Sequence, residues 1–512
     1  MTSLAGEARP RPRLGWPTML AFGFGSVSRA LKARSMSVFL LLYYNQVIGL
    51  TPALVSALIF VSVVFDAVVD PIVGQVSDNF RSRLGRRHPF MYAALIPVPI
   101  LFFALWNPPV GQSDGVIAAY FLIVLLSLKL FDTFFDLPAS ALLPELVQDY
   151  DKRSVWIAVR SAFNSLTPLA LSILAYNVFL KENADGSGGV LARDGYFGFA
   201  VFGALVMFTA MLTATVATHR QIPWLSQARP STPPLRQILR ETTRTLGNPS
   251  FLAYLGLATA IAVSAGVKQS LDIYWNLYVF GLQQSQMAGV ASVGVIGIGA
   301  GVLAAPSLIK RFGRKHLLQF SLVAAFVFMV LPLTLWLMGL APPNGSQALY
   351  TLLVVDAIAG QFFFVIYGMC GSGLLADVVE DVEVKTGLRS EGVLFAAEGL
   401  MSKSVGGVGA LTAGLLLTLV HFPREAARDS VPPETLERLA LTFIPTLGVA
   451  MLLGMISVSF YRISRSKHEA NLAVLQARRE AAGPADARTA SPASPRVSPE
   501  AFGQDRTDAE PA

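Results

Sequence analysis

Residues 52–77 of the chain read PALVSALIFVSVVFDAVVDPIVGQVS, and residues 78–87 read DNFRSRLGRR. The first stretch is long and apolar enough to cross the roughly 30 Å of bilayer hydrocarbon as a helix. The second holds four arginines among ten residues, which is typical of a loop on the cytoplasmic side of a membrane. Together they predict a membrane-spanning helix followed by a cytoplasmic loop.

The apolar pattern of residues 52–77 recurs along the chain. Of its 512 residues, 53% are hydrophobic and 14% are charged, whereas a soluble protein of this size needs a more polar exterior. We expect an all-α membrane protein, because lipid leaves the edge of an open sheet without hydrogen-bond partners. The twelve predicted spans lie near 18–48, 52–77, 89–107, 114–146, 154–180, 196–218, 250–281, 286–309, 316–340, 347–378, 390–420 and 438–462.

Basic residues gather in alternate loops between these spans. The three richest loops hold Arg81, Arg83, Arg86 and Arg87; Arg220, Arg229, Arg236, Arg240 and Arg244; and Lys310, Arg311, Arg314 and Lys315. The net charge of +7 therefore follows the positive-inside rule and does not indicate a nucleic-acid partner. This rule places the basic loops and both termini in the cytoplasm, in a multi-pass protein of the inner (plasma) membrane.

A polar, proline-containing segment separates six spans from six spans. The predicted organisation is a cytoplasmic segment 1–17, a six-helix half 18–218, a central cytoplasmic linker 219–249, a second six-helix half 250–465 and a cytoplasmic tail 466–512. The tail is rich in Ala, Pro and Ser, a composition typical of disorder. We expect the tail to begin with a short helix near 467–480 and to be disordered after it.

Two short motifs repeat at a spacing that matches six spans. Arg83-Leu-Gly-Arg-Arg-His recurs 228 residues later as Arg311-Phe-Gly-Arg-Lys-His, and Leu142-Leu-Pro-Glu-Leu-Val recurs 232 residues later as Leu374-Leu-Ala-Asp-Val-Val. Duplication of a six-helix unit explains both offsets. Two parallel six-helix repeats around a central pathway are the arrangement of major-facilitator transporters, which is the fold expected here.

The repeated basic motif has an expected role in gating. We predict that its charges and turns brace the cytoplasmic side when the pathway is closed there. The residues concerned are Asp78, Arg83, Gly85, Arg86, Arg87, Arg311, Gly313 and Arg314.

Two carboxylates lie within the second span, where an ionisable side chain costs about 2.5–3.5 kcal/mol to insert. Asp66 and Asp70 are four residues apart, so they project from one helical face and repel each other. Either one of them holds a proton or a cation lies between them, and both outcomes describe a coupling-ion site. The alternative is that a Lys or Arg of a neighbouring helix neutralises them as a structural lock.

The fourth span repeats this spacing in Asp132 and Asp136, with Thr133 as an additional hydroxyl ligand. Lys129 precedes Asp132 by three residues and is expected to neutralise it, which makes Asp132 a structural acid. Asp136 then remains available to a solute or an ion.

Other spans contribute further charges. Arg160 of the fifth span and Lys403 of the eleventh are the expected cationic partners, and Glu398 lies five residues before Lys403. Arg29 of the first span either lines the pathway or reaches toward the cytoplasmic surface. In the seventh span, Lys268 and Asp272 are expected to neutralise each other, since they are four residues apart.

The sequence contains no signature of catalysis. It has no Walker loop, no Cys/His metal cluster and no Gly-x-Ser-x-Gly turn, and its single cysteine, Cys370, excludes an intramolecular disulfide. We therefore expect a protein that is not an enzyme, needs no cofactor beyond a coupling ion, Na⁺ or H⁺, and functions as a monomer.

Four motifs of the sequence also resemble those of a known family. The resemblance rests on Phe65-Asp-Ala-Val-Val-Asp-Pro-Ile-Val-Gly, Arg81-Ser-Arg-Leu-Gly-Arg-Arg-His-Pro, Phe135-Asp-Leu-Pro-Ala-Ser-Ala-Leu and Lys385-Thr-Gly-Leu-Arg-Ser-Glu-Gly. These motifs are similar to those of the glycoside–pentoside–hexuronide:cation symporters, the melibiose-carrier branch of the major facilitator superfamily. The resemblance covers roughly residues 18–462.

The resemblance implies roles for single residues. The cation site that it implies comprises Asp66, Asp70 and Thr133. The solute pocket that it implies comprises Arg29, Asp136, Arg160 and Lys403, and we expect Glu398 to bind the solute as well. The chain departs from the melibiose carrier at the sugar contacts, where Ala30 and Ser140 replace an acid and a stacking tryptophan, and also at Val69 and Glu398, which replace an asparagine and a glutamine. The galactoside pocket is therefore not reproduced, whereas most of the cation site is.

The function expected is symport of a sugar or sugar-like solute with a cation, so the partners are a small-molecule solute and the lipid bilayer. One alternative is a carrier for an amphiphile such as a lysolipid or conjugated sterol, which the missing sugar contacts favour. Another is a membrane sensor or scaffold that does not transport and uses the tail as its output.

Overall fold

The computed structural model describes residues 14–182, 188–225, 248–386, 391–461, 463 and 465–481 of the chain. Its contacts divide the chain into two units. The larger unit comprises Met1–Ala376 and Glu391–Arg462, and the smaller comprises Asp377–Ser390 and Ile463–Ala512. Both six-helix halves fall within the larger unit, except for the end of the tenth span from Asp377 onward.

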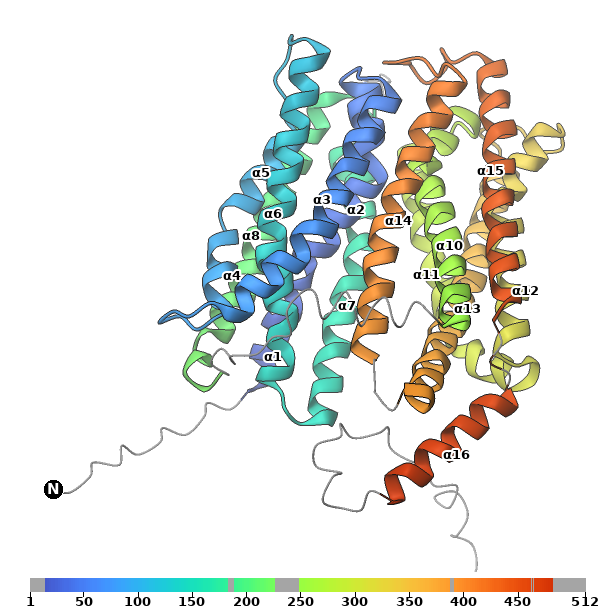
Figure 1. Cartoon of the computed structure of the whole chain (residues 1–512). Helices are drawn as coiled ribbons and strands as arrows, with labels where there is room; N and C mark the ends of the chain where they lie inside the picture. The colour runs from blue at the N-terminus through green and yellow to red at the C-terminus, as the bar shows by residue number, and fades with distance from the viewer. Residues whose placement is uncertain are drawn as a thin grey trace, which may run out of the picture. The chain divides into compact units, whose positions relative to one another are not determined.

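Helices follow one another through both halves (Figure 1). The N-terminal half contains α1 (Trp16–Phe24), α2 (Ser26–Leu42), η1 (Tyr43–Val47), α3 (Pro52–Asn79), α4 (His88–Ala94), α5 (Pro97–Leu105), α6 (Asp114–Leu146), α7 (Tyr150–Leu174), η2 (Ala175–Phe179) and α8 (Arg193–His219), followed by η3 (Ile222–Trp224). The C-terminal half contains α10 (Pro249–Tyr274), η4 (Trp275–Val279), α11 (Gln284–Phe312), α12 (Arg314–Leu337), α13 (Gln347–Thr386), α14 (Glu391–Leu419) and α15 (Pro433–Ser459), and α16 (Arg465–Ala481) comes after it.

These helices match the twelve predicted spans. Ten of the described segments are long and apolar enough to cross a membrane. The remaining two are the first span, where α1 and α2 meet at Gly25, and α14, whose described apolar part is Val405–Leu419. The expected all-α fold of two six-helix halves is confirmed.

Proline and polar caps set where several spans begin. Pro52 and Pro249 stand at the first turn of α3 and α10, where a missing N–H group costs no hydrogen bond. The Asn248 side chain accepts a hydrogen bond from the backbone N–H of Ser250 at 2.9 Å, which satisfies one of the open donors at the start of α10. Asp149 caps α7 in the same way, through the backbone N–H of Lys152 at 3.0 Å.

The two halves repeat each other in backbone conformation. Gly85 and Gly313 occupy corresponding positions in the two basic motifs, and each has φ of +75°, a value that glycine adopts without a steric cost. The first span of each half ends in a π-helical turn, η1 or η4. Gly49 and Gly281 follow these turns with φ of +87° and +59°, so the repeat extends beyond the motifs that the sequence shows.

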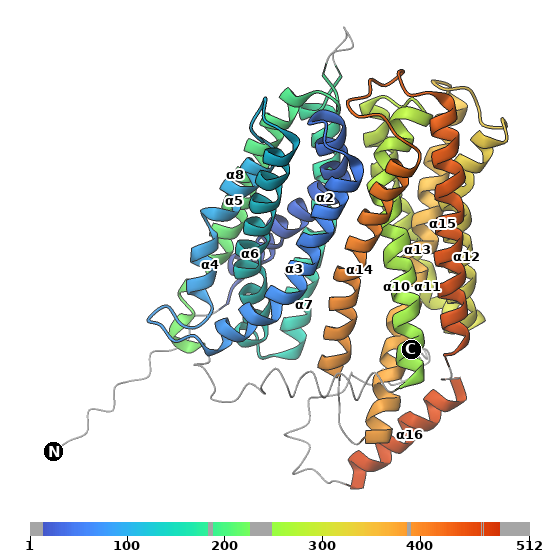
Figure 2. The ribbon, with the colours of Figure 1, turned by 45° about the horizontal axis from the view of Figure 1, so that its top comes forward.

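Among the described residues, the two halves meet mainly where α2 lies against α10, α3 against α14, and α7 with η2 against α11. Figure 2 shows α2 and α3 on one side of this interface and α10 and α14 on the other. Close packing of α3 against α14 depends on Gly407, because a Cβ there would lie 2.8 Å from a side-chain atom of Val63. Glycine therefore lets these two helices approach along the central interface.

A buried group of hydrogen bonds, here called the latch, joins the halves at one end. Asn45 and Gln46 of η1 contribute the side chains of the N-terminal half. Tyr274 donates to Oδ1 of Asn45 at 3.0 Å, and the backbone N–H of Ala426 donates to Oε1 of Gln46 at 2.9 Å. Tyr278 also donates to Gln46, at 3.3 Å. We call this end of the bundle the η1 end; its loops are those predicted to be extracellular.

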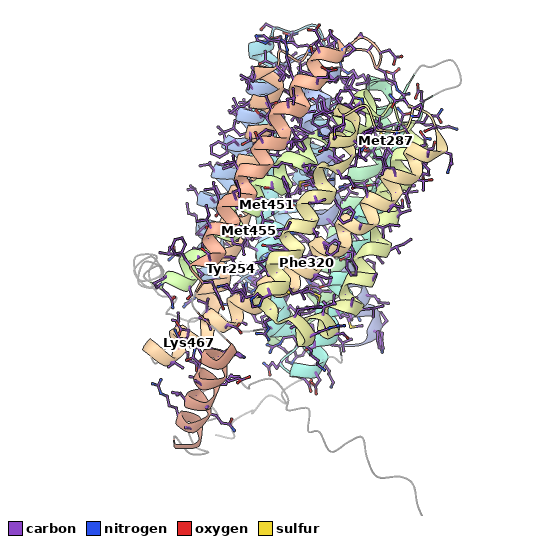
Figure 3. The ribbon with its side chains drawn as sticks, turned by 90° about the vertical axis from the view of Figure 1, so that its right-hand side faces the viewer. Tyr254, Met287, Phe320, Met451, Met455 and Lys467 are labelled. Carbon is purple, nitrogen blue, oxygen red and sulfur yellow. The ribbon has the colours of Figure 1, made fainter. Side chains whose placement is uncertain are left out.

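The outer face of the C-terminal half is apolar. Large hydrophobic side chains exposed on α12 and α15 include Phe320, Val323, Val327, Leu452, Leu453 and Ile456. Figure 3 looks onto this face and labels Phe320 on α12 and Met455 on α15. Exposed apolar surface of this extent is expected where a helix faces lipid.

The smaller unit contains α16 and the end of α13. His468 of α16 lies 2.9 Å from Glu380 and 3.3 Å from Asp377, and Lys467 lies 3.4 Å from Asp381. α16 occupies the place of the short helix predicted near 467–480. The rest of the tail from residue 482 onward, and residues 226–247 of the predicted linker, lie outside the described residues.

Candidate functional site

A cavity of about 510 Å³ lies between the two halves. It begins at Leu40 and Leu41, just below the latch, and follows α2 to Arg29, which corresponds to about 17 Å of helix. Its N-terminal wall carries Arg29, Lys32, Asp66, Asp70, Lys129, Asp132, Thr133 and Asp136. Its C-terminal wall is mostly small and uncharged, with Ala262, Ala265, Gly266, Gly406, Gly407 and Ala410 beside Gln269 and Ser270.

The first acid of the second span is ion-paired. Asp66 on α3 pairs through Oδ2 with the ammonium group of Lys129 on α6, and both side chains are largely buried. The expected pair of Lys129 with Asp132 in the same helix is wrong. Neutralisation from a neighbouring helix, the alternative interpretation of Asp66, is what the structure contains.

The second acid lies beside a hydroxyl group, as the family resemblance implied. Oγ1 of Thr133 lies 2.9 Å from Oδ1 of Asp70 and 3.0 Å from the backbone carbonyl oxygen of Lys129. Its single proton can serve only one of these acceptors at a time. Asp66, Asp70 and Thr133 thus line the same cavity, and carboxylate and hydroxyl oxygen atoms are ligands that hard cations prefer.

Asp132 forms an ion pair with a lysine of the first span. Lys32 of α2 pairs with Oδ2 of Asp132 on α6, and both residues are buried. Asp132 is therefore neutralised by a basic side chain, as predicted for a structural acid, but this side chain belongs to another helix. Lys32 was not among the predicted site residues, although a lysine within an apolar span is a signal of the same kind as Asp66.

Asp136 holds two arginines. Its Oδ2 lies 3.3 Å from Nη1 of Arg29, and its Oδ1 lies 3.7 Å from Nη2 of Arg160. Arg160 also donates to Oγ of Ser140 at 2.7 Å. Arg160 is thus a cationic partner in this cluster, as the sequence predicted. Asp136 is not left free for a solute or an ion, so any solute must compete with one of these arginines. The Arg29 side chain is 48% exposed and that of Arg160 only 20%, so Arg29 is the more accessible of the two.

Comparison with known proteins identifies the family of this chain. The family model for MFS/sugar transport proteins matches residues 21–465, which includes both halves and every residue of the cavity. The chain belongs to this family. It is therefore a transporter of the major facilitator superfamily, and its relatives include proteins named as symporters.

Individual relatives resemble this transporter along their whole length. A protein of Synechocystis named as an uncharacterized symporter is 24% identical over 91% of this chain and 98% of its own length. The isoprimeverose transporter of Lactiplantibacillus pentosus is 20% identical over 88% of this chain and 89% of its own. Among solved structures, the nucleoside transporter NupG superposes with a TM-score of 0.60 over 88% of this chain and 100% of its own, at 12% identity. The resemblance to the symporter branch is thereby confirmed, and NupG supports the fold alone.

The C-terminal half of the transporter carries a smaller group of charges. Lys268 and Asp272 pair at 3.2 Å within α10, as their spacing predicted. Asp356 of α13 lies within electrostatic reach of both and was missed, although it too is an acid in an apolar span. Glu398 and Lys403 belong to α14, but their side chains lie outside the described residues.

The basic motif ties helix ends together inside the N-terminal half. Arg87 lies 3.2 Å from Asp78 at the end of α3 and donates through Nε to Glu145 of α6 at 2.8 Å. Arg86 pairs with the same carboxylate. Glu145 was not predicted as a site residue, although it is the acid of the repeated Leu-Leu-Pro-Glu motif. Arg83 and Arg311 are exposed.

Proposed function

We propose that this transporter moves a sugar or sugar-like polar solute together with a cation, Na⁺ or H⁺, across the inner (plasma) membrane by alternating access. The observation that carries the proposal is the charged cavity between two halves that the latch joins at the η1 end. Substrate sites of major-facilitator transporters lie at this interface between repeats.

The cavity has the size and the chemistry for a small polar solute. Its volume of about 510 Å³ lies within the roughly 300–1,000 Å³ of small-molecule sites. Arg29 and Asp136 offer a charged donor and a charged acceptor to solute hydroxyl groups, and Gln269 offers an amide from the opposite wall. Arg160 does not line the cavity but pairs with Asp136. The similarity to an isoprimeverose transporter supports a sugar.

Cation coupling is assigned to Asp66, Asp70 and Thr133. Their oxygen atoms lie in the same cavity as the proposed solute contacts, so occupation of one site changes the field at the other. The similarity to proteins named as symporters supports coupled transport.

The proposed orientation places the basic loops and both termini in the cytoplasm. In the structure, the latch closes the end predicted to be extracellular, while the accessible Arg29 lies toward the other end. Arg86 and Arg87, held by Asp78 and Glu145, then brace the cytoplasmic ends of α3, α4 and α6 while the halves rock.

Uptake into membrane vesicles under an imposed Na⁺ or H⁺ gradient tests the proposal. A panel of labelled sugars, hexuronates and lysolipids identifies the solute class, and one class is expected to accumulate against its own gradient. Asp70→Asn is expected to abolish this accumulation but to leave exchange of labelled for unlabelled solute. Full accumulation by Asp70→Asn contradicts the assignment of the cation site.

An amphiphile is a second candidate, favoured by the uncharged wall of Ala262, Ala265, Gly266 and Gly407. A solute with one polar and one apolar face matches the two unlike walls of the cavity. Accumulation of lysolipid with no accumulation of any sugar decides for this candidate.

A further inference from the structure

The ammonium group of Lys129 binds one acid of the candidate cation site. It pairs with Oδ2 of Asp66, while Asp70, one helical turn further along α3, lies 2.9 Å from the hydroxyl group of Thr133. Lys32 and Asp132 lie close enough to interact with it electrostatically. A positive charge that belongs to the protein is therefore already paired with one of the two carboxylates that a coupling cation would need.

The charges around the cavity balance without an added ion. Of the described residues that line the cavity or pair with its lining, four are acidic and four are basic. The acids are Asp66, Asp70, Asp132 and Asp136, and the bases are Arg29, Lys32, Lys129 and Arg160. A sodium ion added here leaves one positive charge in excess in a partly buried site, where like charges repel more strongly than in water.

We propose that the Lys129 ammonium group stands in the place of a coupling sodium ion, so that solute movement in this transporter does not depend on Na⁺. An ammonium group carries one positive charge and donates up to three hydrogen bonds to oxygen atoms. It can therefore neutralise the same carboxylates that a bound sodium ion would neutralise. Because Lys129 is fixed to α6, this cation stays with the protein and cannot be released on either side of the membrane. The inference rests on the proposed function. It excludes Na⁺ as the coupling ion and leaves H⁺ as the cation that moves with the solute.

Substitution of Lys129 separates this proposal from a purely structural ion pair. If the ammonium group stands in for sodium, its removal leaves Asp66, Asp70 and Thr133 as an oxygen site with room for an ion. If Lys129 only stabilises the fold, its removal lowers stability and creates no response to a particular cation.

The experiment measures thermal unfolding of the purified transporter in NaCl and in choline chloride of equal concentration, without solute. The wild-type protein is expected to show no difference between the two salts. Lys129→Gly is expected to show a saturable rise in Tm that is specific to Na⁺, because an ion that binds only the folded state stabilises it by mass action. Lys129→Gln is a second variant in case Lys129→Gly does not fold.

Two controls define the site. Lys129→Arg keeps the charge and is expected to stay insensitive to Na⁺. Lys129→Gly combined with Asp70→Asn is expected to lose the Na⁺ response, or to retain it with an affinity at least about tenfold weaker, since one carboxylate is gone.

Two results overturn the proposal. One is a saturable Na⁺ response of the wild-type protein that Asp70→Asn abolishes. The other is the absence of any Na⁺ response in folded Lys129→Gly and Lys129→Gln. Neither result depends on transport, so failure of the proposed function, seen as no uptake of any solute by wild-type vesicles, is distinguished from failure of this inference.

Discussion

Tyr274 of α10 donates a hydrogen bond to Asn45 of η1 across the interface between the halves, over 3.0 Å. Both side chains are almost fully buried. Asn45 is held in orientation by a second bond, in which its amide donates to the carbonyl oxygen of Leu50 at 2.8 Å. This pair therefore stabilises the state in which the η1 end is closed.

Removal of the Tyr274 hydroxyl is expected to favour the state that is open at the η1 end. Tyr274→Phe keeps the ring that packs against Phe422 but loses one buried hydrogen bond, worth about 0.5–1.5 kcal/mol. The ratio of open to closed states should rise by about two- to tenfold. The measurement is the rate at which an impermeant maleimide, added from the predicted extracellular side, labels Ser37→Cys in a Cys370→Ser background.

Tyr120→Phe is the matched control for this prediction. Its hydroxyl donates to the carbonyl oxygen of Ala104 at 2.9 Å, a bond within the N-terminal half, so labelling should not change. Equal labelling of the Tyr274→Phe protein and its parent would mean that the latch does not set the conformational equilibrium.

The Lys32–Asp132 pair is expected to affect stability through charge balance rather than through net attraction. Lys32→Met alone or Asp132→Leu alone leaves a buried charge without its partner, which costs about 3–5 kcal/mol. The double variant removes both charges and should recover most of the lost Tm. The measurement is thermal unfolding of the purified protein.

The Lys268–Asp272 pair supplies the comparison. Its side chains are 44% and 49% exposed, so replacement of both charges together should cost less than about 1 kcal/mol. A double Lys32–Asp132 variant that is no more stable than the worse single variant would show that the pair contributes a specific attraction.

Helical spacing accounts for what the sequence could predict about the site. Asp66 and Asp70, or Lys268 and Asp272, lie four residues apart, and that spacing alone fixes which side chains share a helical face. The twelve spans follow from apolar stretches of sufficient length. Both kinds of prediction need only one helix at a time.

Pairs between helices depend on packing that no single span encodes. Lys129 has Asp132 within reach along its own helix, but the approach of α3 brings Asp66 to it instead. Lys32 reaches Asp132 from a different helix, α2, whose main neighbours are α7, α8 and α10. The latch was missed for the same reason, since Asn45 and Gln46 resemble ordinary polar residues at the end of a span.

Arg29 and Arg160 are expected to differ in their effects although both contact Asp136. Arg29 is the more accessible, so Arg29→Gln should weaken solute binding and raise KM by about tenfold or more, with little change in Tm, through the loss of a charged hydrogen bond worth about 1.5–3 kcal/mol. Arg160 also anchors Ser140 at 2.7 Å, so Arg160→Gln should lower Tm as well. Uptake kinetics together with thermal unfolding make the comparison, and equal loss of Tm in both variants would contradict it.

Two adjacent glycines of α14 are expected to respond differently to the same substitution. A Cβ at Gly407 would lie 2.8–3.0 Å from side-chain atoms of Val63 on α3, whereas a Cβ at Gly406 would meet nothing within 4 Å. Gly407→Ala should therefore force α3 and α14 apart and lower Tm, since overpacking typically costs about 1–3 kcal/mol. Gly406→Ala should leave Tm unchanged or raise it, because alanine favours the helix by about 0.5–1 kcal/mol. The two variants differ by one position and by the contact alone, so equal Tm values would show that Val63 can move aside and that glycine is not required for this packing.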